Sequence, residues 1–277
     1  MPVNQLTVGN VTITALSDGM LEFDLCNFFP GMPVEDWQPH QHHLTDDGKL
    51  RFNLGSYLLR TDGRTVLVDT GMGPRLEPDN PWGKLLQALA SHGLSPNAVD
   101  LVVLTHAHRD HVGWNLQSDN GKYRPTFPNA RYYLSALDWE TCHNPEVVST
   151  RFPNAPQCVW PLAELGVLEL MRGEQALTSE LTTLPTPGHT PGHTSIMVNS
   201  QGERAIIMGD TFHNPAQVVE TGWISRADMD PAQTRRTRDF LLDRLEREGA
   251  TAVSGHFPAP GFGRIVRLEG RRYWQAR

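Results

Sequence analysis

Three histidines and an aspartate fall within six consecutive residues, in the segment His106-Ala107-His108-Arg109-Asp110-His111. Neutral imidazole nitrogens and carboxylate oxygens are the atoms that bind Zn²⁺ and its first-row neighbours in proteins. An apolar run at residues 99–105 leads into the segment, and alternate side chains of an extended chain face the same way. We therefore expect His106, His108 and Asp110 to point into one cavity, and a tight turn to bring His111 beside them. The alternative is a solvated, histidine-rich loop.

Further residues of metal-binding type follow downstream, each at the end of an apolar run or within a Gly/Pro turn. They are His189 and His193 in a run Gly-His-Thr-Pro-Gly-His, Asp210 after a glycine, and His256 after another glycine. Glycine beside such a residue lets the backbone turn sharply or approach an ion closely. Loops that follow strands are where a rigid sheet positions functional side chains, so these residues favour a shared site over a surface loop.

The order His-x-His-x-Asp-His, Gly-His-Thr-Pro-Gly-His, Gly-Asp and Gly-His resembles the metallo-β-lactamase-fold hydrolase superfamily, from about Val66 to Pro258. Within that superfamily the chain is most similar to the methyl parathion hydrolase and quorum-quenching lactonase group, because of the runs at 188–195, 209–213 and 255–263. The resemblance implies an α/β fold, a four-layer αββα sandwich of two mixed sheets with outer helices. We expect residues 1–277 to form a single domain.

The resemblance also implies a site for two divalent metal ions. The first ion would be held by His106, His108 and His189, and the second by Asp110, His111 and His256. Asp210 would bridge the two ions. Asp110 would also act catalytically, by orienting the nucleophile and carrying a proton to the leaving group. Zinc is the expected metal, and manganese, iron or cobalt also suit nitrogen and oxygen ligands.

Three more residues are expected near the site. Asp69 matches a family position that supports the site from behind, where a carboxylate would fix an imidazole ring. An ordinary turn aspartate at a strand end is the alternative. His193 is not a metal ligand in the family pattern, so a structural or supporting role is expected. His213 follows Asp210 by three residues and is expected to face the pocket and contact substrate.

Such a site implies hydrolysis. A hydroxide shared by two ions would attack lactones, esters or organophosphate triesters, and no serine or cysteine nucleophile is needed. The alternatives are a glyoxalase II-like thioesterase, a persulfide dioxygenase with a single iron, and a metal-binding sensor without turnover. Only about twenty residues follow His256, which disfavours the thioesterase because its family normally carries a separate C-terminal helical domain.

The composition narrows the class of partner. The chain has 277 residues and a net charge of −7, which argues against nucleic acid as the main substrate. Arg235, Arg236 and Arg238 are interleaved with acidic residues, and such mixed charge is typical of a solvated helix face. Three cysteines, the lack of a recognisable signal peptide and the lack of a long apolar run predict a cytoplasmic protein without a membrane partner. We expect a homodimer.

The pattern of apolar residues predicts the elements that position the site. Strands are expected at 11–16, 52–59, 65–68, 99–104, 131–134, 195–199 and 204–208, with edge strands at 167–170 and 181–184 and a final pair within 265–273. Helices are expected at 82–92, after an N-cap at Ser135, and at 231–248. The last of these should bury Phe240, Leu241 and Leu245 on one side.

Two segments rich in aromatic residues and proline could cover the site, at about 20–50 and at 139–160. Their apolar character predicts a small, uncharged, hydrophobic ester, lactone or phosphotriester as substrate. The expected substrate contacts are Phe28, Phe29, Trp37 and Phe257, together with His213. Packing of these aromatics as core or as a dimer contact is the alternative. His40, His42 and His43 have no strand to hold them and are expected at the surface.

Overall fold

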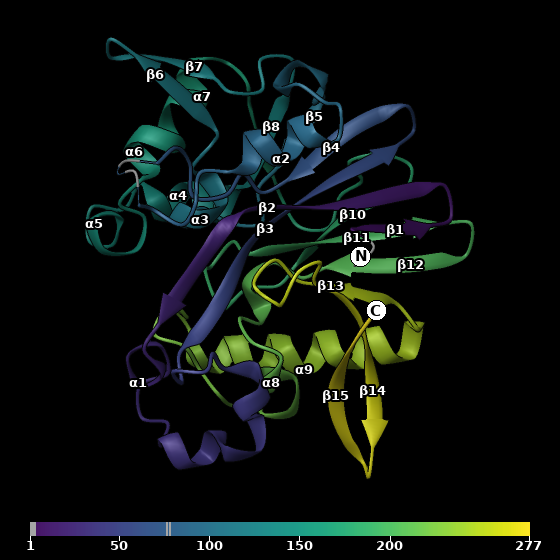
Figure 1. The fold of residues 1–277 in the computed structure, drawn as a ribbon. Helices are drawn as coiled ribbons and strands as arrows, with labels where there is room; N and C mark the ends of the chain where they lie inside the picture. The colour runs from purple at the N-terminus through teal and green to yellow at the C-terminus, as the bar shows by residue number, and fades with distance from the viewer. Residues whose placement is uncertain (1–3, 76, 78) are drawn as a thin grey trace.

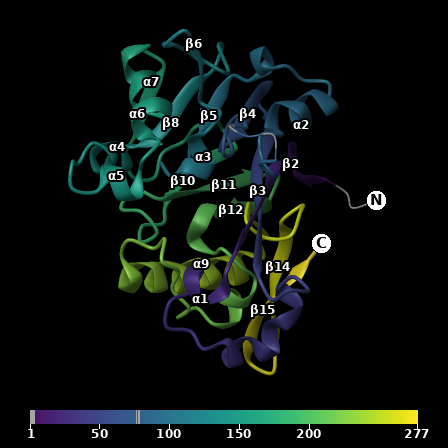
Figure 2. The same ribbon diagram turned by 60° about the vertical axis from the view of Figure 1, so that its left-hand side comes forward.

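Two β-sheets lie face to face in the computed structural model, which describes residues 4–75, 77 and 79–277 (Figures 1 and 2). The first sheet has the order β1 (Gln5–Val8), β2 (Val11–Phe23), β3 (Leu50–Thr61), β4 (Arg64–Val68), β5 (Leu101–Val103), β8 (Arg131–Ser135), β9 (Leu168–Met171). The second has the order β10 (Leu181–Pro185), β11 (Thr194–Ser200), β12 (Glu203–Ile207), β13 (Thr251–Val253), β14 (Phe262–Leu268), β15 (Arg271–Ala276). Strands β6 (Leu116–Asp119) and β7 (Lys122–Pro125) form a separate hairpin.

Both sheets are mixed, as the resemblance predicted. In the first sheet, β4, β5, β8 and β9 pair in parallel, and in the second β12 and β13 do so, while the other pairs are antiparallel. Side chains between the sheets form one buried cluster that includes Ile13, Val68, Val103, Ile196 and Val253. Burying one face of each sheet against the other is what holds such a sandwich together.

Helices cover the outer faces, which completes the four layers. The helices are α1 (Leu25–Phe28), α2 (Leu85–Ser91), α3 (Arg109–Val112), α4 (Ala136–Cys142), α5 (Val148–Arg151), α6 (Ala155–Cys158), α7 (Trp160–Glu164), α8 (Ala216–Val219) and α9 (Pro231–Glu248). Short 3₁₀ turns are η1 (Val34–His43), η2 (Pro96–Ala98) and η3 (Gly209–Thr211). Helix α2 packs on the first sheet, and α9 crosses the outer face of the second (Figure 1). The predicted αββα fold is therefore confirmed. No helix in the described part of the chain is long and apolar enough to cross a bilayer.

Helix α9 shows where the sequence pattern was right and where it failed. Asp230 caps its first turn by accepting a hydrogen bond from the Gln233 amide, and Gly249 ends it with a φ of 59°. Leu241 and Leu245 are buried as predicted, but Phe240 is 45% exposed. Phe240 lies one residue before Leu241, and a step of about 100° per residue turns its side chain off the buried stripe.

Other expected elements were right in kind and wrong at their ends. The edge strands, the final strand pair and the Ser135 N-cap are confirmed. Helix α2 begins at Leu85 rather than at residue 82, because the Leu85 amide donates to the buried Asp18 carboxylate at 2.7 Å. Strand β2 runs to Phe23 and β3 starts at Leu50, so the expected loop at 20–50 is confined to residues 24–49.

Residues 24–49 contribute to a small, separate hydrophobic cluster. Phe28, Phe29 and Trp37 pack with Phe52 and Trp223 in one buried cluster. His40 was expected at the surface, and this prediction is wrong: its side chain is buried, with its ring centroid 5.2 Å from that of Trp223. Burial lowers the pKa of His40, so the neutral ring packs against the indole. His42 is exposed, as predicted.

Candidate metal centre

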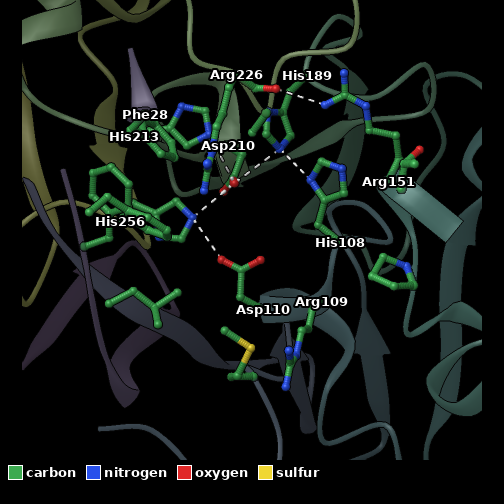
Figure 3. A pocket seen from close by; sticks show the side chains of 17 residues that line it. Phe28, His108, Arg109, Asp110, Arg151, His189, Asp210, His213, Arg226 and His256 are labelled. Atoms are coloured by element: carbon green, nitrogen blue, oxygen red, sulfur yellow. Dashed lines mark hydrogen bonds and ion pairs between the residues drawn. The ribbon is translucent and has the colours of Figure 1, made fainter. Parts of the chain in front are cut away.

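The histidine-rich segment leaves the end of β5 and then turns into a short helix. His108 lines the cavity (Figure 3), and the buried His106 lies beneath it, with its ligand atom in one group with those of His108 and His189. The alternation does not continue to Asp110, because helix α3 begins at Arg109. A helical turn takes the place of the expected tight turn, and it brings Asp110 and His111 into one group of ligand atoms with His256.

The first expected group of ligands is brought together as three facing imidazole rings. His106 Nε2 lies 3.1 Å from His108 Nδ1, which lies 2.8 Å from His189 Nε2. Nitrogens that share a zinc ion at about 2.1 Å stand roughly 3.4 Å apart in a tetrahedral site, so this spacing needs only a small expansion around an ion. His189 comes from the loop between β10 and β11, eighty-one residues after His108.

The second expected group lies beside the first. Asp110 Oδ2 is 3.7 Å from His111 Nε2 and 3.4 Å from His256 Nε2, where His256 follows strand β13. His111 Nε2 is buried, and no contact among the described residues gives it a hydrogen bond of good geometry, although carboxylate oxygens of Asp210 and Asp110 lie 3.2 and 3.7 Å away. A buried ring nitrogen that faces carboxylate oxygens without a well-formed hydrogen bond is in the environment that a bound cation satisfies.

Asp210 lies between the two groups. Its Oδ1 is 3.2 Å from His111 Nε2, and its Oδ2 is 3.1 Å from His256 Nε2 and 3.4 Å from His189 Nε2. The same Oδ2 is 3.8 Å from His106 Nε2. One carboxylate therefore contacts histidines of both groups, which is the position required of a bridging ligand.

In four of the rings, the nitrogen that points away from the other ligand atoms makes a hydrogen bond, and this bond determines which nitrogen is free to bind a metal. When the outer nitrogen of an imidazole donates its N–H to an acceptor, the inner nitrogen keeps a lone pair for a metal. The four outer contacts are His106 Nδ1 to Thr105 Oγ1 (3.0 Å), His111 Nδ1 to Asp69 Oδ2 (2.8 Å), His189 Nδ1 to Asp228 Oδ1 (3.0 Å) and His256 Nδ1 to the Asn53 carbonyl (2.9 Å). The residues present thus fit a pair of divalent metal ions.

Asp69 lies behind His111, where a supporting carboxylate was expected. Besides His111, its carboxylate accepts hydrogen bonds from the Thr105 amide and the Thr105 hydroxyl. Thr105 in turn accepts from His106, so one aspartate orients two rings. The φ of Asp69 is 61°, so the residue does lie in a turn at the end of a strand, as the alternative of an ordinary turn aspartate described. The same residue also supports the site, because its side chain bonds to His111 and Thr105.

His193 holds the backbone of Asp210. The Asp210 amide donates to His193 Nε2 at 2.9 Å, and His193 Nδ1 donates to the Thr186 carbonyl at 3.0 Å. Burial lowers the pKa of His193 to about 3, so the ring stays neutral and both nitrogens are in use. A Cβ at Gly209, whose φ is 53°, would lie 2.5 Å from His193 Nε2, which explains the glycine.

Three buried charged residues near the site were missed by sequence reasoning. Asp228 accepts from His189 and lies 3.4 Å from the Arg238 guanidinium. Arg238 was expected on a solvated face, and this is wrong: its side chain is fully buried and donates to the Thr211 and Trp223 carbonyls. Its position three residues before Leu241, on the apolar stripe of α9, was the signal that could have found it.

Asp138 was the third. It accepts hydrogen bonds from the amides of Ala107 and Gly192 and from the Thr190 hydroxyl. These contacts join the loop of His106 and His108 to the loop of His189. No local motif marks Asp138, because its partners come from segments thirty-one or more residues away.

The pKa values in the cluster are set by two opposing influences, burial and the charges of the neighbouring histidines and carboxylates. Burial alone raises the pKa of Asp210, but His111, His256 and His106 together hold it well below its ordinary value. Burial lowers the pKa of His106 and of His108, and these rings stay neutral. Burial also acts to lower the pKa of His111, yet the carboxylates around it raise that pKa well above the ordinary value. Neutral rings and an ionised carboxylate are the forms that bind metals.

A cavity of about 460 Å³ opens over the cluster. Phe28 and His213 line it, as predicted. Both ring nitrogens of His213 are buried without a well-formed hydrogen bond among the described residues, and Nε2 lies 3.5 Å from Asp210 Oδ2. Phe29, Trp37 and Phe257 do not line it; all three are buried in the hydrophobic clusters around it. For these three the core alternative holds, because their rings are used up in packing.

Residues 56–256 match the metallo-beta-lactamase superfamily, and the chain belongs to that superfamily. The motif order had indicated this membership. The N-acyl homoserine lactonase of Bacillus thuringiensis is 23% identical over 230 residues, which are 77% of this chain and 84% of the lactonase.

Solved structures share the fold over nearly the whole chain. AidC, a dizinc quorum-quenching lactonase solved with the product N-hexanoyl-L-homoserine, aligns with a TM-score of 0.84 and 23% identity, over 99% of this chain and 96% of AidC. AbOPH, a hydrolase of the beta-lactamase superfamily, aligns with a TM-score of 0.83 and 25% identity, over 98% and 96% of the two chains.

Proposed function

We propose that this protein is a hydrolase that uses two divalent metal ions to open lactones or cleave esters. The observation that carries the proposal is the set of ring nitrogens that face the cavity, each fixed by a hydrogen bond on its far side, around the Asp210 carboxylate. His106, His108 and His189 would hold one ion, Asp110, His111 and His256 the other, and Asp210 both. Zinc is the metal we expect, in line with the dizinc lactonase that shares the fold.

Bound ions would lower the pKa of water toward neutrality and polarise the substrate carbonyl. The chain contributes the rest. Asp110 is the most exposed carboxylate of the cluster and lines the cavity, so it can orient the attacking water and pass a proton to the leaving oxygen. His213 lines the same cavity, with its Nε2 3.5 Å from Asp210 Oδ2 and no well-formed hydrogen bond at either ring nitrogen, and it can hold an oxygen of the substrate.

The apolar part of the cavity supports an ester or lactone with a hydrophobic group. Leu21, Phe23, Phe28, Phe52 and Met72 line one part of it. Burying a hydrocarbon group against such a wall supplies binding free energy without directional contacts. The similarity to N-acyl homoserine lactonases points to the same class of bond. Organophosphate triesters, with a phosphoryl oxygen in place of the carbonyl, are proposed as secondary substrates.

The experiment is proton release from a long-chain acyl-homoserine lactone, followed with metal-loaded and chelator-stripped protein. We expect acid production only with metal bound. Aryl esters and phosphotriesters are then assayed in the same way. Oxygen uptake on a persulfide with one bound iron would point to the dioxygenase alternative, and silence of a fully metallated protein on every substrate would point to a sensor.

The variant His189→Ala tests the site itself, with His92→Ala as a matched control because His92 is exposed at the end of α2. We expect His189→Ala to lose metal and activity while His92→Ala keeps both. Full metal content and full activity in His189→Ala would show that the proposed ligand set is wrong.

A further inference from the structure

The walls of the cavity over the metal centre differ in chemistry. One wall carries the apolar residues of β2, α1 and β3, among them Phe23 and Phe28. The opposite side carries Arg151 at the end of α5, and a second arginine, Arg226 in the loop before α9, also lines the cavity. Figure 3 shows Phe28 and Arg151 on opposite sides of Asp210, with Arg226 on the His189 side of the cavity. The sequence had suggested an uncharged substrate, and the arginines do not fit that expectation.

Both guanidinium groups are held in place by neutral acceptors. Arg151 Nη1 donates to the Arg226 carbonyl at 2.9 Å, which ties the two residues together. Arg226 Nη1 donates to Asn27 Oδ1 at 2.6 Å, and its guanidinium carbon lies 5.7 Å from the centre of the Phe23 ring. The Arg226 amide also donates to the Phe28 carbonyl. The Arg226 guanidinium is therefore held against the aromatic wall, and Arg151 is joined to Arg226 through the Arg226 backbone carbonyl.

Neither arginine has a carboxylate within ion-pair distance in the part of the chain that the structure describes. Other arginines of the chain are paired with acids, as Arg267 and Arg272 are with Glu246. A guanidinium has five N–H donors, and each of these two uses only part of them on neutral oxygens. Two such groups leave a local positive charge at the active-site cavity of a chain whose net charge is −7.

We propose that Arg151 and Arg226 form a carboxylate-binding subsite, and that the substrate is an ester or lactone with an anionic group on one side of the scissile bond and an apolar group on the other. This rests on the proposed hydrolase function. The apolar group lies against Phe28 and Phe52, the bond to be cleaved lies over Asp110 and Asp210, and the carboxylate lies at the arginines. The planar guanidinium fork is the group that recognises a carboxylate through paired hydrogen bonds.

The test compares esters that differ only in charge. Phenyl pentanoate and the monophenyl ester of glutaric acid form one pair, with the charge on the acyl side. Phenyl butanoate and meta-carboxyphenyl butanoate form the other, with the charge on the leaving group. We expect one of the two charged esters to have a kcat/KM about tenfold or more above that of its neutral twin. Raising the salt concentration should reduce this preference, because the guanidinium groups are partly exposed.

The variants Arg151→Gln and Arg226→Gln should remove that preference. We expect the ratio of kcat/KM for the charged ester to that for its neutral twin to fall roughly 10- to 100-fold in each variant. Arg64→Gln is the matched control, because Arg64 is an exposed arginine at the start of β4, outside the cavity. An equal fall of both esters, or no charge preference in the unmodified enzyme, would overturn the subsite.

A binding measurement separates the subsite from the proposed reaction. The metal-loaded protein is titrated with 2-phenylglutarate and with 2-phenylbutanoate, which share the ring and one carboxylate. The diacid should bind about tenfold more tightly, and Arg151→Gln should abolish the difference. Metal-dependent cleavage of neutral esters without this difference would reject the subsite and leave the hydrolase standing. The difference without cleavage of any ester would reject the hydrolase and retain the subsite.

Discussion

The back and the mouth of this site are built in different ways. At the back, buried rings such as His106, His111 and His189 are each fixed by a hydrogen bond on the far side. At the mouth, Phe23, Arg151 and Arg226 come from segments with no shared motif, and both guanidinium groups bond to neutral oxygens. The back is therefore fixed by hydrogen bonds between buried side chains, while the mouth is held by contacts between neighbouring loops, and we expect substitutions at the mouth to leave metal binding intact.

This difference separates chemistry from specificity. A metal ion tolerates little variation in ligand number or geometry, so the residues behind each ligand are as constrained as the ligand itself. A substrate subsite needs only complementary shape and charge, so its residues can come from any loop that reaches the cavity. We expect changes at the back to alter metal content, and changes at the mouth to alter KM and substrate preference.

The largest effect should follow from Asp210→Asn at the back. The substitution removes the one carboxylate that contacts histidines of both groups, and it directs an amide N–H₂ at the surrounding imidazoles. We expect loss of both bound metals and a fall in kcat/KM of roughly 1000-fold or more. Metal content by elemental analysis and initial rates on one ester measure the two effects. A variant that keeps two metals per chain and a tenth of the activity would contradict the bridging role.

A smaller effect should follow from Asp228→Asn, one layer further out. The neutral amide still accepts from His189 but no longer offers it a full negative charge, and Arg238 loses its only ion pair among the described residues. We expect the affinity for metal to fall about 10- to 100-fold, with the fold retained.

The control for that variant lies two residues further along. Asp230 caps α9 from an exposed position, and asparagine is an equally good N-cap, so Asp230→Asn should leave metal affinity unchanged. Competition with a chelator of known affinity measures both variants. Equal metal affinities for Asp228→Asn and Asp230→Asn would show that the charge of Asp228 does not support metal binding by His189.

The metal centre also predicts a dependence on pH that differs between its two groups. In the metal-free chain, carboxylates led by Asp210 raise the pKa of His111 and of His256 against the effect of burial, so both rings hold a proton to higher pH than they would without these neighbours. The pKa of His106 and of His108 is lowered by burial, so those rings stay neutral. A raised pKa means that metal must displace a proton. As pH falls, the group of His111 and His256 should thus lose its ion before the group of His106 and His108 does.

Proton release on metal binding measures this directly. Calorimetric titration of metal-free protein in two buffers of different ionisation enthalpy gives the number of protons released by each ion. We expect more protons from the second ion than from the first. Equal release for both ions, or none, would show that the two groups do not differ in protonation as their surroundings imply.

Sequence alone could predict the back of the site because its residues lie in short motifs. His106, His108 and His111 fall within six residues, and His189, Asp210 and His256 each follow a strand or a glycine turn. The same short range explains why the supporting partners were missed. Asp228 and Asp138 carry no local signal, since each acts on a residue that only the folded chain brings near.

The fold was predicted in its layers and missed in its details for related physical reasons. Apolar periodicity reports which face of an element is buried, and it gave α9 its position and its leucines. A reading of apolar periodicity assigns charged residues to the exposed face, and so it predicted that Arg238 is in contact with solvent. In the structure Arg238 is buried, and the Asp228 carboxylate and two backbone carbonyls stabilise its charge. Apolar periodicity also cannot distinguish an aromatic residue that lines a pocket from one that is buried in a small core. For this reason Phe28, Phe29 and Trp37 were all predicted to contact substrate, although only Phe28 lines the cavity.

The smallest effect should come from Phe23→Ala at the mouth. Phe23 lines the cavity, is half-buried, and has ring centroids of Phe28 and Phe52 at 5.1 and 5.4 Å, while the Arg226 guanidinium lies over its ring. Removing the ring deletes apolar surface that a substrate would cover, which is worth about 1–2 kcal/mol of binding free energy, or roughly 5- to 30-fold in KM for a hydrophobic ester. Metal content should stay at the level of the unmodified protein, because the ring of Phe23 contacts the rings of Phe28 and Phe52 and the Arg226 guanidinium, none of which is a proposed metal ligand or supports one by a hydrogen bond. A loss of metal in Phe23→Ala would mean that the mouth also holds the back in place, and the two regions would then have to be treated as one cooperative unit.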